Sequence, residues 1–419
     1  MISIRGGEVL TVDGWIRADV LVDGENVATI GGDLRGDVEI DASGCWVGPG
    51  FVDMHTHLRE PGQTWKEDTA SACAAAAAGG FTALTAMPNT DPPMDSVKII
   101  DAVRDRAERI GIAEVVPAGA MTKGRGGAHL ADLEEMYRAG VRLFSDDGDA
   151  LADPDLVSAA MGLIAKLPGA IFAQHAEDAR KTAGGHMHAG AMARKLGIGG
   201  LPADAETDVV RRDLEVAARS GVRYHCQHVS AKSTVEVIRE ARESGMAVSA
   251  EVTPHHLIFD ESALANLDPN FKMYPPLRSP EDREALVAGL HDGVIEVVAT
   301  DHAPHRPDEK AVGFEDAPRG VIGLETAAPA TWEAVGDRSL LFSVLSSNPA
   351  RILGLESQGS LAEGAPANLV VFDPVRSWVP TRFASKSSNS PFKDRVLRGQ
   401  VRSTLYRGTI THLDGESAR

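Results

Sequence analysis

Cysteine, aromatic residues and positive charge are all scarce in this chain. Its 419 residues include three widely spaced cysteines, and aromatic side chains make up only 5%. Without a close cysteine pair, the sequence argues against a disulfide framework or a thiolate zinc cluster and is typical of a reducing cytoplasm. The 42 lysines and arginines face 60 acidic residues, which gives a net charge of −18. Because nucleic acids and anionic membranes need a basic surface, the composition disfavours both as partners.

Long apolar runs are also missing. The N-terminal segment lacks the basic and apolar regions of a signal peptide. The Ala-rich stretch at residues 70–87 is interrupted by Gly79 and Gly80, so we interpret it as a helix, a turn and a strand rather than a membrane span. We therefore expect a soluble, cytoplasmic protein.

Apolar, strand-like segments alternate with Ala-rich helical segments through the middle of the chain. This alternation predicts a parallel sheet built from βα units. Eight such strands over roughly 300 residues favour an α/β fold of the (β/α)8 TIM-barrel type. A doubly wound open sheet is the alternative, but no GxGxxG motif opens the first unit. The strands are expected near residues 51–57, 81–88, 114–121, 141–146, 170–175, 223–229, 247–253 and 295–301.

The two ends of the chain have a different pattern. Short strand candidates separated by turn signals occupy residues 1–50 and again 360–412. We expect residues 1–50 and 355–419 to form one composite β-sandwich domain. Residues 51–354 are then expected to form the catalytic barrel domain.

Histidine and aspartate residues lie at the ends of several predicted strands. In a barrel of this type the C-terminal strand ends meet at one face, so side chains from distant segments converge there. His55 and His57 alternate along the first strand and therefore project to the same side. Imidazole and carboxylate ligands suit divalent ions, so we predict a centre for two ions, with zinc favoured over manganese or cobalt. The strand ends carry His55 and His57, Asp146 and Asp147, His175, His225 and His228, and Asp301, His302 and His305, from which four histidines and two carboxylates would supply the ligands.

Other histidines near the strand ends are not expected to be ligands. His225 lies three positions from His228, so strand alternation sends it to the opposite face, and we expect a structural role. His255 and His256 follow the seventh predicted strand, where they would support or pack against the site.

A centre of two ions bridged by a carboxylate has hydrolytic chemistry. The ions lower the pKa of a shared water, which makes hydroxide available at neutral pH, and they polarise a carbonyl group under attack. Asp301, at the edge of the site, can carry the proton between this hydroxide and a leaving nitrogen. The residues thus favour hydrolysis or formation of an amide bond.

A set of motifs along the chain carries a resemblance to a known family. The motifs are DMHTHLREPG (53–62), AMPNT (86–90), FSDDG (144–148), AQHAED (173–178), AEVTPHHL (250–257), PPLRSPEDREAL (275–286), ATDHAPH (299–305) and GLET (323–326). Together they resemble the bacterial class I dihydroorotases of the amidohydrolase superfamily, over nearly the whole chain. The resemblance implies reversible cyclisation of N-carbamoyl-L-aspartate to L-dihydroorotate, a step of pyrimidine synthesis.

The resemblance also implies which residues hold which ion. By motif, one metal would be held by His55, His57 and Asp301, and the other by His175 and His228. Many relatives bridge the two metals with a carboxylated lysine, which the FSDDG motif lacks. The class I pattern implies Asp147 as the bridge, although spacing alone leaves Asp146 open.

The implied substrate is a small dianion. In the family its ring carboxylate is bound by the residues matching Arg59, Asn89 and His305. A guanidinium fork, an amide donor and an imidazole form a reasonable anion site in an otherwise acidic protein.

One position departs from the family pattern. Where the family has N-P-P-L-R, this chain has Tyr274 before the two prolines. A substrate contact through the backbone would survive this change, whereas a contact through the side chain would not. Backbone groups near Arg319 and Gly320 complete ring binding in the family, within a charged, turn-rich loop.

Two other functions stay open on the sequence alone. The first is another cyclic-amide hydrolase of the hydantoinase or allantoinase type, although Arg59 favours an anionic ring and hydantoinases typically keep the bridging lysine. The second is a non-catalytic, dihydroorotase-like scaffold for aspartate transcarbamoylase, which the complete set of candidate ligands disfavours. We also expect a homodimer, and an active enzyme could itself assemble with aspartate transcarbamoylase.

Overall fold

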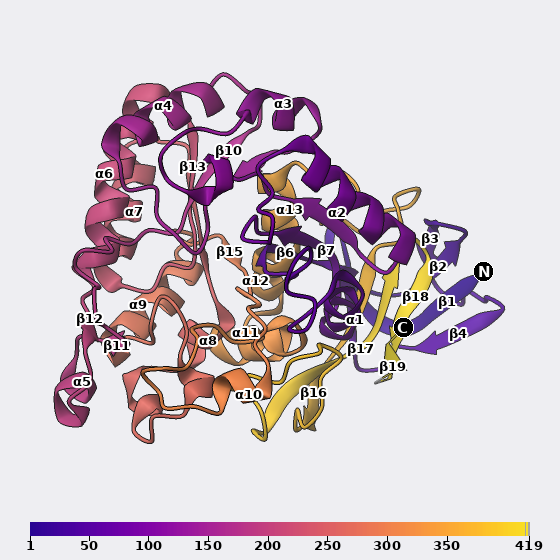
Figure 1. The fold of residues 1–419 in the computed structure, drawn as a ribbon. Coiled ribbons are helices and arrows are strands. Elements are labelled where there is room, and N and C mark those ends of the chain that lie inside the picture. The colour runs from indigo at the N-terminus through magenta and orange to yellow at the C-terminus, as the bar shows by residue number, and fades with distance from the viewer. Residues whose placement is uncertain (415, 418–419) are drawn as a thin grey trace.

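The computed structural model describes residues 1–414 and 416–417 (Figure 1). Parallel strands with helices around them make up the middle of the chain, and a mixed sheet that contains both chain ends lies beside them. The α/β class predicted from the alternating segments is therefore confirmed.

The parallel strands form a sheet of three and a sheet of five. Their bounds are β6 Phe51–Thr56, β7 Phe81–Ala86, β8 Glu114–Pro117, β9 Leu143–Phe144, β10 Ile171–Gln174, β13 Arg223–Cys226, β14 Val248–Val252 and β15 Val297–Val298. The strand orders are β6–β7–β8 and β15–β14–β13–β10–β9. Isolated parallel bridges connect the two sheets at both edges, between Thr56 and His302 and between Gly119 and Phe144. Each strand lies within a segment predicted from the sequence, but the observed strands are shorter.

The Ala-rich segment at residues 70–87 forms a helix, a turn and a strand, as predicted. Helix α1 (Thr69–Gly79) begins at Asp68, whose side chain accepts the Ser71 N–H while the Ser71 hydroxyl accepts the Asp68 N–H. This reciprocal capping pairs two backbone donors that a helix start otherwise leaves free. Gly80 ends the helix at a φ of 88°, a left-handed conformation that glycine adopts without strain. The chain then enters β7, all of which is buried.

Helices cover the outer side of the parallel strands (Figure 1). In α2 (Val97–Ile110) the buried residues Ile100, Val103 and Ala107 are spaced by three and four, which places them on one helix face. The other helices are α3 Leu133–Arg138, α4 Pro154–Ile164, α6 Asp204–Ser220, α7 Lys232–Glu243, α8 Pro254–Ile258, α9 Pro280–His291, α10 Pro307–Lys310, α11 Ala327–Val335, α12 Arg338–Phe342 and α13 Asn348–Leu353. Between β10 and α6 the chain makes an excursion, at the lower left of Figure 1, that contains β11 Met187–His188, α5 Ala191–Leu196 and β12 Gly200–Leu201.

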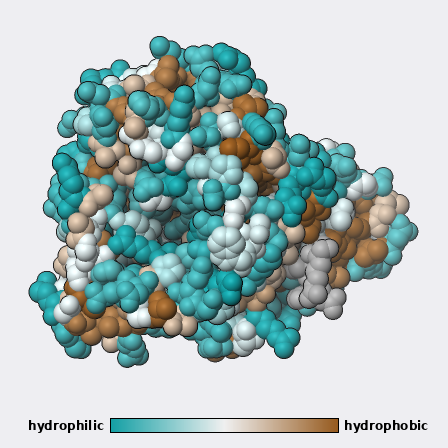
Figure 2. All heavy atoms as spheres, viewed as in Figure 1, coloured by the Kyte–Doolittle hydropathy of each residue, from teal (hydrophilic) through white to brown (hydrophobic). Residues whose placement is uncertain are grey.

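The face drawn in Figure 2 is mostly hydrophilic, with apolar residues in smaller patches. This distribution agrees with the surplus of acidic side chains in the sequence. Among the described residues, none of the helices has both the length and the apolar character needed to cross a membrane.

Strands from both chain ends form one mixed sheet. Their bounds are β1 Ile2–Thr11, β2 Gly14–Asp23, β3 Asn26–Gly31, β4 Val38–Asp41, β5 Trp46–Pro49, β16 Leu369–Trp378, β17 Leu397–Tyr406, β18 Thr409–Leu413 and β19 Glu416–Ser417. The order is β19–β18–β17–β16–β5–β1–β2–β3, and the antiparallel pair β5–β16 joins the two ends. The first half of β1 pairs with β4, and its second half pairs with β5.

Aromatic packing connects this mixed sheet to the parallel strands. The Phe342 ring lies 5.4 Å from the Trp15 ring on β2 and 5.5 Å from the Phe51 ring on β6. Phe342 is only 1% exposed. It also packs directly on Gly48 of β5, where an added Cβ would lie 2.4 Å from the Phe342 ring. The two parts of the protein therefore share one packed interface.

Replacing Phe342 with alanine should destabilise the protein strongly, because the cavity would open where the two parts meet. We expect a loss of about 3–5 kcal/mol in the free energy of unfolding, measured by chemical denaturation. Val375→Ala is the matched control, since Val375 is 64% exposed and its truncation should change little. Equal stability of the two variants would contradict this packing account.

Candidate active site

Six side chains from the ends of five parallel strands converge in one buried cluster. None of the six is more than 6% exposed. The cluster contains His55 and His57 from β6, Asp147 after β9, His175 after β10, His228 after β13 and Asp301 after β15. All six are among the strand-end residues named from the sequence, and the structure brings them together.

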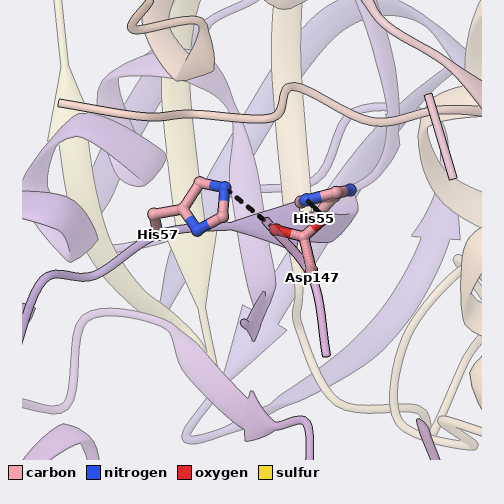
Figure 3. A group of neighbouring side chains, drawn as sticks. All are labelled: His55, His57 and Asp147. Carbon is pink, nitrogen blue, oxygen red and sulfur yellow. Dashed lines mark ion pairs between the residues drawn. The ribbon is translucent and has the colours of Figure 1, made fainter. Parts of the chain in front are cut away.

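The Asp147 carboxylate faces His55 and His57, as Figure 3 shows, and it also lies close to His175 and His228. Its Oδ1 is 3.2 Å from Nε2 of His55 and 3.5 Å from Nε2 of His228. The same oxygen is 3.6 Å from Nδ1 of His175, while Oδ2 is 3.5 Å from Nε2 of His57. One carboxylate therefore faces both the His55–His57 pair and the His175–His228 pair.

Two overlapping groups of side chains in the cluster have the spacing of a metal site. One is His55, His57 and Asp147, and the other is Asp147, His175 and His228, each with ligand atoms within 4.8 Å of one another. Asp301 adds Oδ1 to the first group, 2.9 Å from Nε2 of His57. Nε2 of His55 and Oδ1 of Asp147 are buried without a hydrogen-bond partner. Buried polar atoms are rarely left unpaired, so this donor set fits divalent ions as the missing partners.

Hydrogen bonds on the far side of the His55 and His57 rings decide which ring nitrogen of each faces the cluster. Nδ1 of His55 lies 2.6 Å from Oε1 of Glu251, and Nδ1 of His57 lies 2.8 Å from Oδ1 of Asn89. A carboxylate and an amide oxygen only accept hydrogen bonds, so in both rings Nδ1 carries the hydrogen. In the neutral form of each ring, Nε2 is then left with a lone pair, which is the form that binds a metal.

Glu251 is a functional residue that the sequence analysis missed. It lies on β14, is fully buried, and shares that strand with three apolar residues and Ser249. Burial favours a raised pKa, but the neighbouring His55 and hydrogen bonds from His225 and His55 outweigh it and hold the Glu251 pKa well below its usual range. An acidic residue inside an apolar strand of the AEVTPHHL motif was the available signal.

The structure shows which of the two neighbouring aspartates, Asp146 or Asp147, faces the histidines, a choice that the sequence spacing left open. Asp146 turns away from the histidines and accepts the backbone N–H groups of Met121 and Thr122 and the Thr122 hydroxyl. Burial raises the pKa of Asp146. At Asp147 burial acts in the same direction, but the charge of His55 and the nearby imidazoles of His175 and His228 outweigh it and lower the pKa well below its usual range.

Arg59 and Asn89 lie beside the cluster with donors to spare. Nε of Arg59 donates to the Pro304 carbonyl at 3.3 Å, and no other acceptor among the described residues takes its N–H groups. Burial lowers the pKa of Arg59 to about 10. Asn89 uses its oxygen for His57, while its amide N–H groups have no acceptor in the described part of the chain. Both side chains can therefore donate to an anion.

His305 lies near Arg59, and both of its ring nitrogens have protein partners. Its Nε2 donates to the Arg319 carbonyl at 2.8 Å, and Nδ1 accepts from Nζ of Lys66 at 3.3 Å. Burial, with Arg59 next in weight, lowers the pKa of His305 to about 2, so the ring is neutral. Both ring nitrogens of His305 therefore have partners. Lys66 is a second cation near Arg59, and the sequence analysis missed it.

Tyr274 lies between the cluster and the loop that carries Arg319. The centre of its ring is 5.2 Å from that of the His175 ring, and Cζ of Arg319 lies 3.8 Å from the centre of the Tyr274 ring. Arg319 also donates to the Gly185 carbonyl at 2.7 Å. The N–H and carbonyl of Gly320 are paired with Lys272 and Asn389. The Tyr274 hydroxyl has no hydrogen-bond partner in the described residues and remains available.

Solved structures with the same fold point to one class of enzyme. The L-hydantoinase (dihydropyrimidinase) from Arthrobacter aurescens superposes with a TM-score of 0.88 at 25% identity, covering 100% of this chain and 97% of that one. A D-hydantoinase from Bacillus sp. AR9 gives 0.84, also at 25% identity, over 100% of this chain and 96% of that one. Together with the buried histidine and aspartate cluster, this likeness defines a metal-dependent cyclic-amide hydrolase.

Sequence relatives narrow the class to one family. The dihydro-orotase-like family profile matches residues 44–234. The dihydroorotase of Mycobacterium tuberculosis (strain ATCC 25618 / H37Rv) is 45% identical over 90% of this chain and 90% of its own length. That of Anaeromyxobacter dehalogenans (strain 2CP-C) is 42% identical over 100% of this chain and 99% of its own. The chain belongs to the dihydroorotase family.

Substituting the two aspartates one at a time should separate their roles. Asp147→Ala should abolish tight metal binding while the folded structure remains, because the shared carboxylate is lost. Asp146→Ala should retain the metal but lose about 1–3 kcal/mol of stability, because buried N–H groups lose their acceptor. Metal analysis and chemical unfolding of both variants measure this, and metal loss in Asp146→Ala alone would reverse the assignment.

Proposed function

We propose that this chain catalyses the reversible cyclisation of N-carbamoyl-L-aspartate to L-dihydroorotate in pyrimidine synthesis. The observation that carries the proposal is the buried Asp147 carboxylate, which faces two histidine pairs next to the cation Arg59. The metal cluster suits amide chemistry, and the cation suits an anionic ring. The curated relatives that carry the name dihydroorotase support the same reaction.

The centre is proposed to hold two divalent ions, with zinc as the favoured metal. His55, His57 and Asp301 would hold one ion, His175 and His228 the other, and Asp147 would bridge them. When bound, such ions supply hydroxide at neutral pH as the nucleophile and polarise the amide carbonyl. The unpartnered Nε2 of His55 and Oδ1 of Asp147 support this arrangement.

Asp301 is proposed as the catalytic proton carrier. Its Oδ1 lies against His57, while Oδ2 has no hydrogen-bond partner in the described part of the chain. A carboxylate with one free oxygen at the edge of the site can accept the proton of the attacking water and return it to the ring nitrogen as the amide breaks.

The substrate carboxylate is proposed to bind Arg59 and the amide N–H of Asn89. Lys66 would add positive charge to the same corner of the site through its place near Arg59. His305 is then proposed to support the site through Lys66 and the Arg319 carbonyl, rather than through a free ring nitrogen.

The remaining substrate contacts are proposed for Tyr274, Arg319 and Gly320. Tyr274 offers its ring and an unpaired hydroxyl beside His175. Arg319 is the partner that holds this ring in place. For Gly320, whose own N–H and carbonyl are paired, the contribution is to shape the loop beside Ala303, where its φ of 119° and a Cβ distance of 2.7 Å require glycine.

The domain organisation is proposed as a (β/α)8 barrel at residues 51–354 with a composite β-sandwich from 1–50 and 355–419. The parallel bridges at both edges of the two parallel sheets support closure into a barrel. The change of partner along β1, from β4 to β5, supports two layers in the terminal domain. A homodimer, and assembly with aspartate transcarbamoylase, stay predictions that light scattering of the purified proteins would test.

Hydantoinase activity is the second candidate, because the two hydantoinase structures share the fold. Arg59 argues against it, since hydantoin lacks the carboxylate that this cation would bind. Comparing turnover of dihydroorotate, hydantoin and allantoin by the same preparation separates these activities. Faster turnover of hydantoin than of dihydroorotate would reject the proposed substrate.

Replacing His57 with alanine should remove one metal ion and nearly all turnover, while the fold stays intact. The reason is that its Nε2 faces both Asp301 and Asp147. Metal content by elemental analysis and the ultraviolet loss of dihydroorotate are the measurements. His291→Ala is the control, because His291 is exposed at the end of α9 and should leave both unchanged. Full activity of His57→Ala would end the proposal.

Replacing Arg59 with glutamine should weaken substrate binding selectively. We expect KM for dihydroorotate to rise about 10- to 100-fold, since one charged hydrogen-bond donor to the carboxylate is lost. Metal content should not change. The control is Arg180→Gln, whose side chain is 92% exposed. An unchanged KM would show that the ring carboxylate binds elsewhere.

A further inference from the structure

A chain of buried hydrogen bonds runs from His55 back into the parallel strands. Nδ1 of His55 lies 2.6 Å from Oε1 of Glu251, and the other oxygen of Glu251 lies 3.1 Å from Nε2 of His225. Nδ1 of His225 lies 2.8 Å from Oγ of Ser249. His55, Glu251 and His225 are all completely buried. The pairing of β13 with β14 places His225 opposite Ser249, which explains why these side chains meet.

The partners determine the direction of each hydrogen bond. The Glu251 carboxylate can only accept, so Nε2–H of His225 and Nδ1–H of His55 both donate to it. In a neutral His225 ring Nδ1 then lacks a hydrogen and accepts from the Ser249 hydroxyl. Every donor in this series of hydrogen bonds therefore points toward Glu251.

Glu251 depends on His225 for one of its oxygens. Oε1 accepts from His55 and from the backbone N–H of His228 at 3.2 Å. Among the described residues, His225 is the only hydrogen-bond donor to Oε2 of Glu251. Without it, a buried carboxylate oxygen would lose its partner, and the carboxylate would be free to turn away from His55.

We propose that His225 is a positioning residue for the candidate metal centre. Among the described residues its hydrogen bonds reach none of the candidate ligands, but it holds Glu251, and Glu251 fixes the tautomer and ring orientation of His55. Nε2 of His55 is then kept as a lone pair that faces Asp147. This role rests on the proposed metal centre and replaces the expectation that His225 is structural only, because the opposite face of β13 leads to Glu251.

Zinc affinity of the whole, metal-free protein tests this role, measured by titrating zinc against a chelating indicator. His225→Phe keeps a ring of similar size but removes the donor, and should weaken binding of one ion about 10- to 100-fold. His225→Gln places an amide N–H where Nε2 was and should retain most of the affinity. His412→Phe, in β18 of the terminal sheet, is the control for loss of a buried imidazole and should bind zinc like the wild type.

The variants separate positioning from packing. Equal zinc affinity of His225→Phe and the wild type would overturn the proposal, and so would equal losses in the Phe and Gln variants. If His225→Phe does not fold, Ser249→Ala serves instead, because it removes the donor to Nδ1 of His225. An unchanged zinc affinity of Ser249→Ala would also overturn the proposal. A wild-type protein that binds no zinc would reject the metal centre itself, whereas the other outcomes reject only the role of His225.

Discussion

The Asp147 carboxylate is buried among four imidazole rings, and the surrounding residues follow from that placement. Removing a carboxylate from water is costly unless charges or hydrogen bonds compensate it. Histidine nitrogens from the ends of three strands face its two oxygens, and the divalent ions that this donor set fits would compensate the charge. Holding those nitrogens in place requires acceptors behind the rings, which Glu251 and Asn89 provide. The position of this one buried carboxylate thus depends on residues as far away as Glu251 on β14.

The sequence predicted the fold class and the cluster because both depend on local signals. Apolar runs marked each parallel strand, and the strand-end rule then brought together histidines as far apart as His55 and His228. Strands β9 and β15 are shorter than expected because their paired residues end before Asp147 and Asp301. Glu251, the role of His225 and the place of Lys66 were not predictable, since each depends on contacts between strands or loops that spacing does not contain.

The same limit applies to the substrate side of the site. Sequence spacing identified Arg59 but could not show that His305 has both ring nitrogens occupied. It identified the departure at Tyr274 without showing that Arg319 stacks on the ring. Both contacts involve the loop that precedes Gly320, whose path is set by tertiary packing. The candidate metal ligands therefore indicate the class of reaction, while this loop and Arg59 are the parts of the site that we propose distinguish one cyclic substrate from another.

The most direct test is a crystal structure of the protein with zinc and dihydroorotate, using anomalous scattering to locate the metal. The account predicts two zinc peaks, one on each side of the Asp147 carboxylate, with the substrate carboxylate against Arg59 and Asn89. A single peak away from Asp147, or a substrate carboxylate that points away from Arg59, would contradict it.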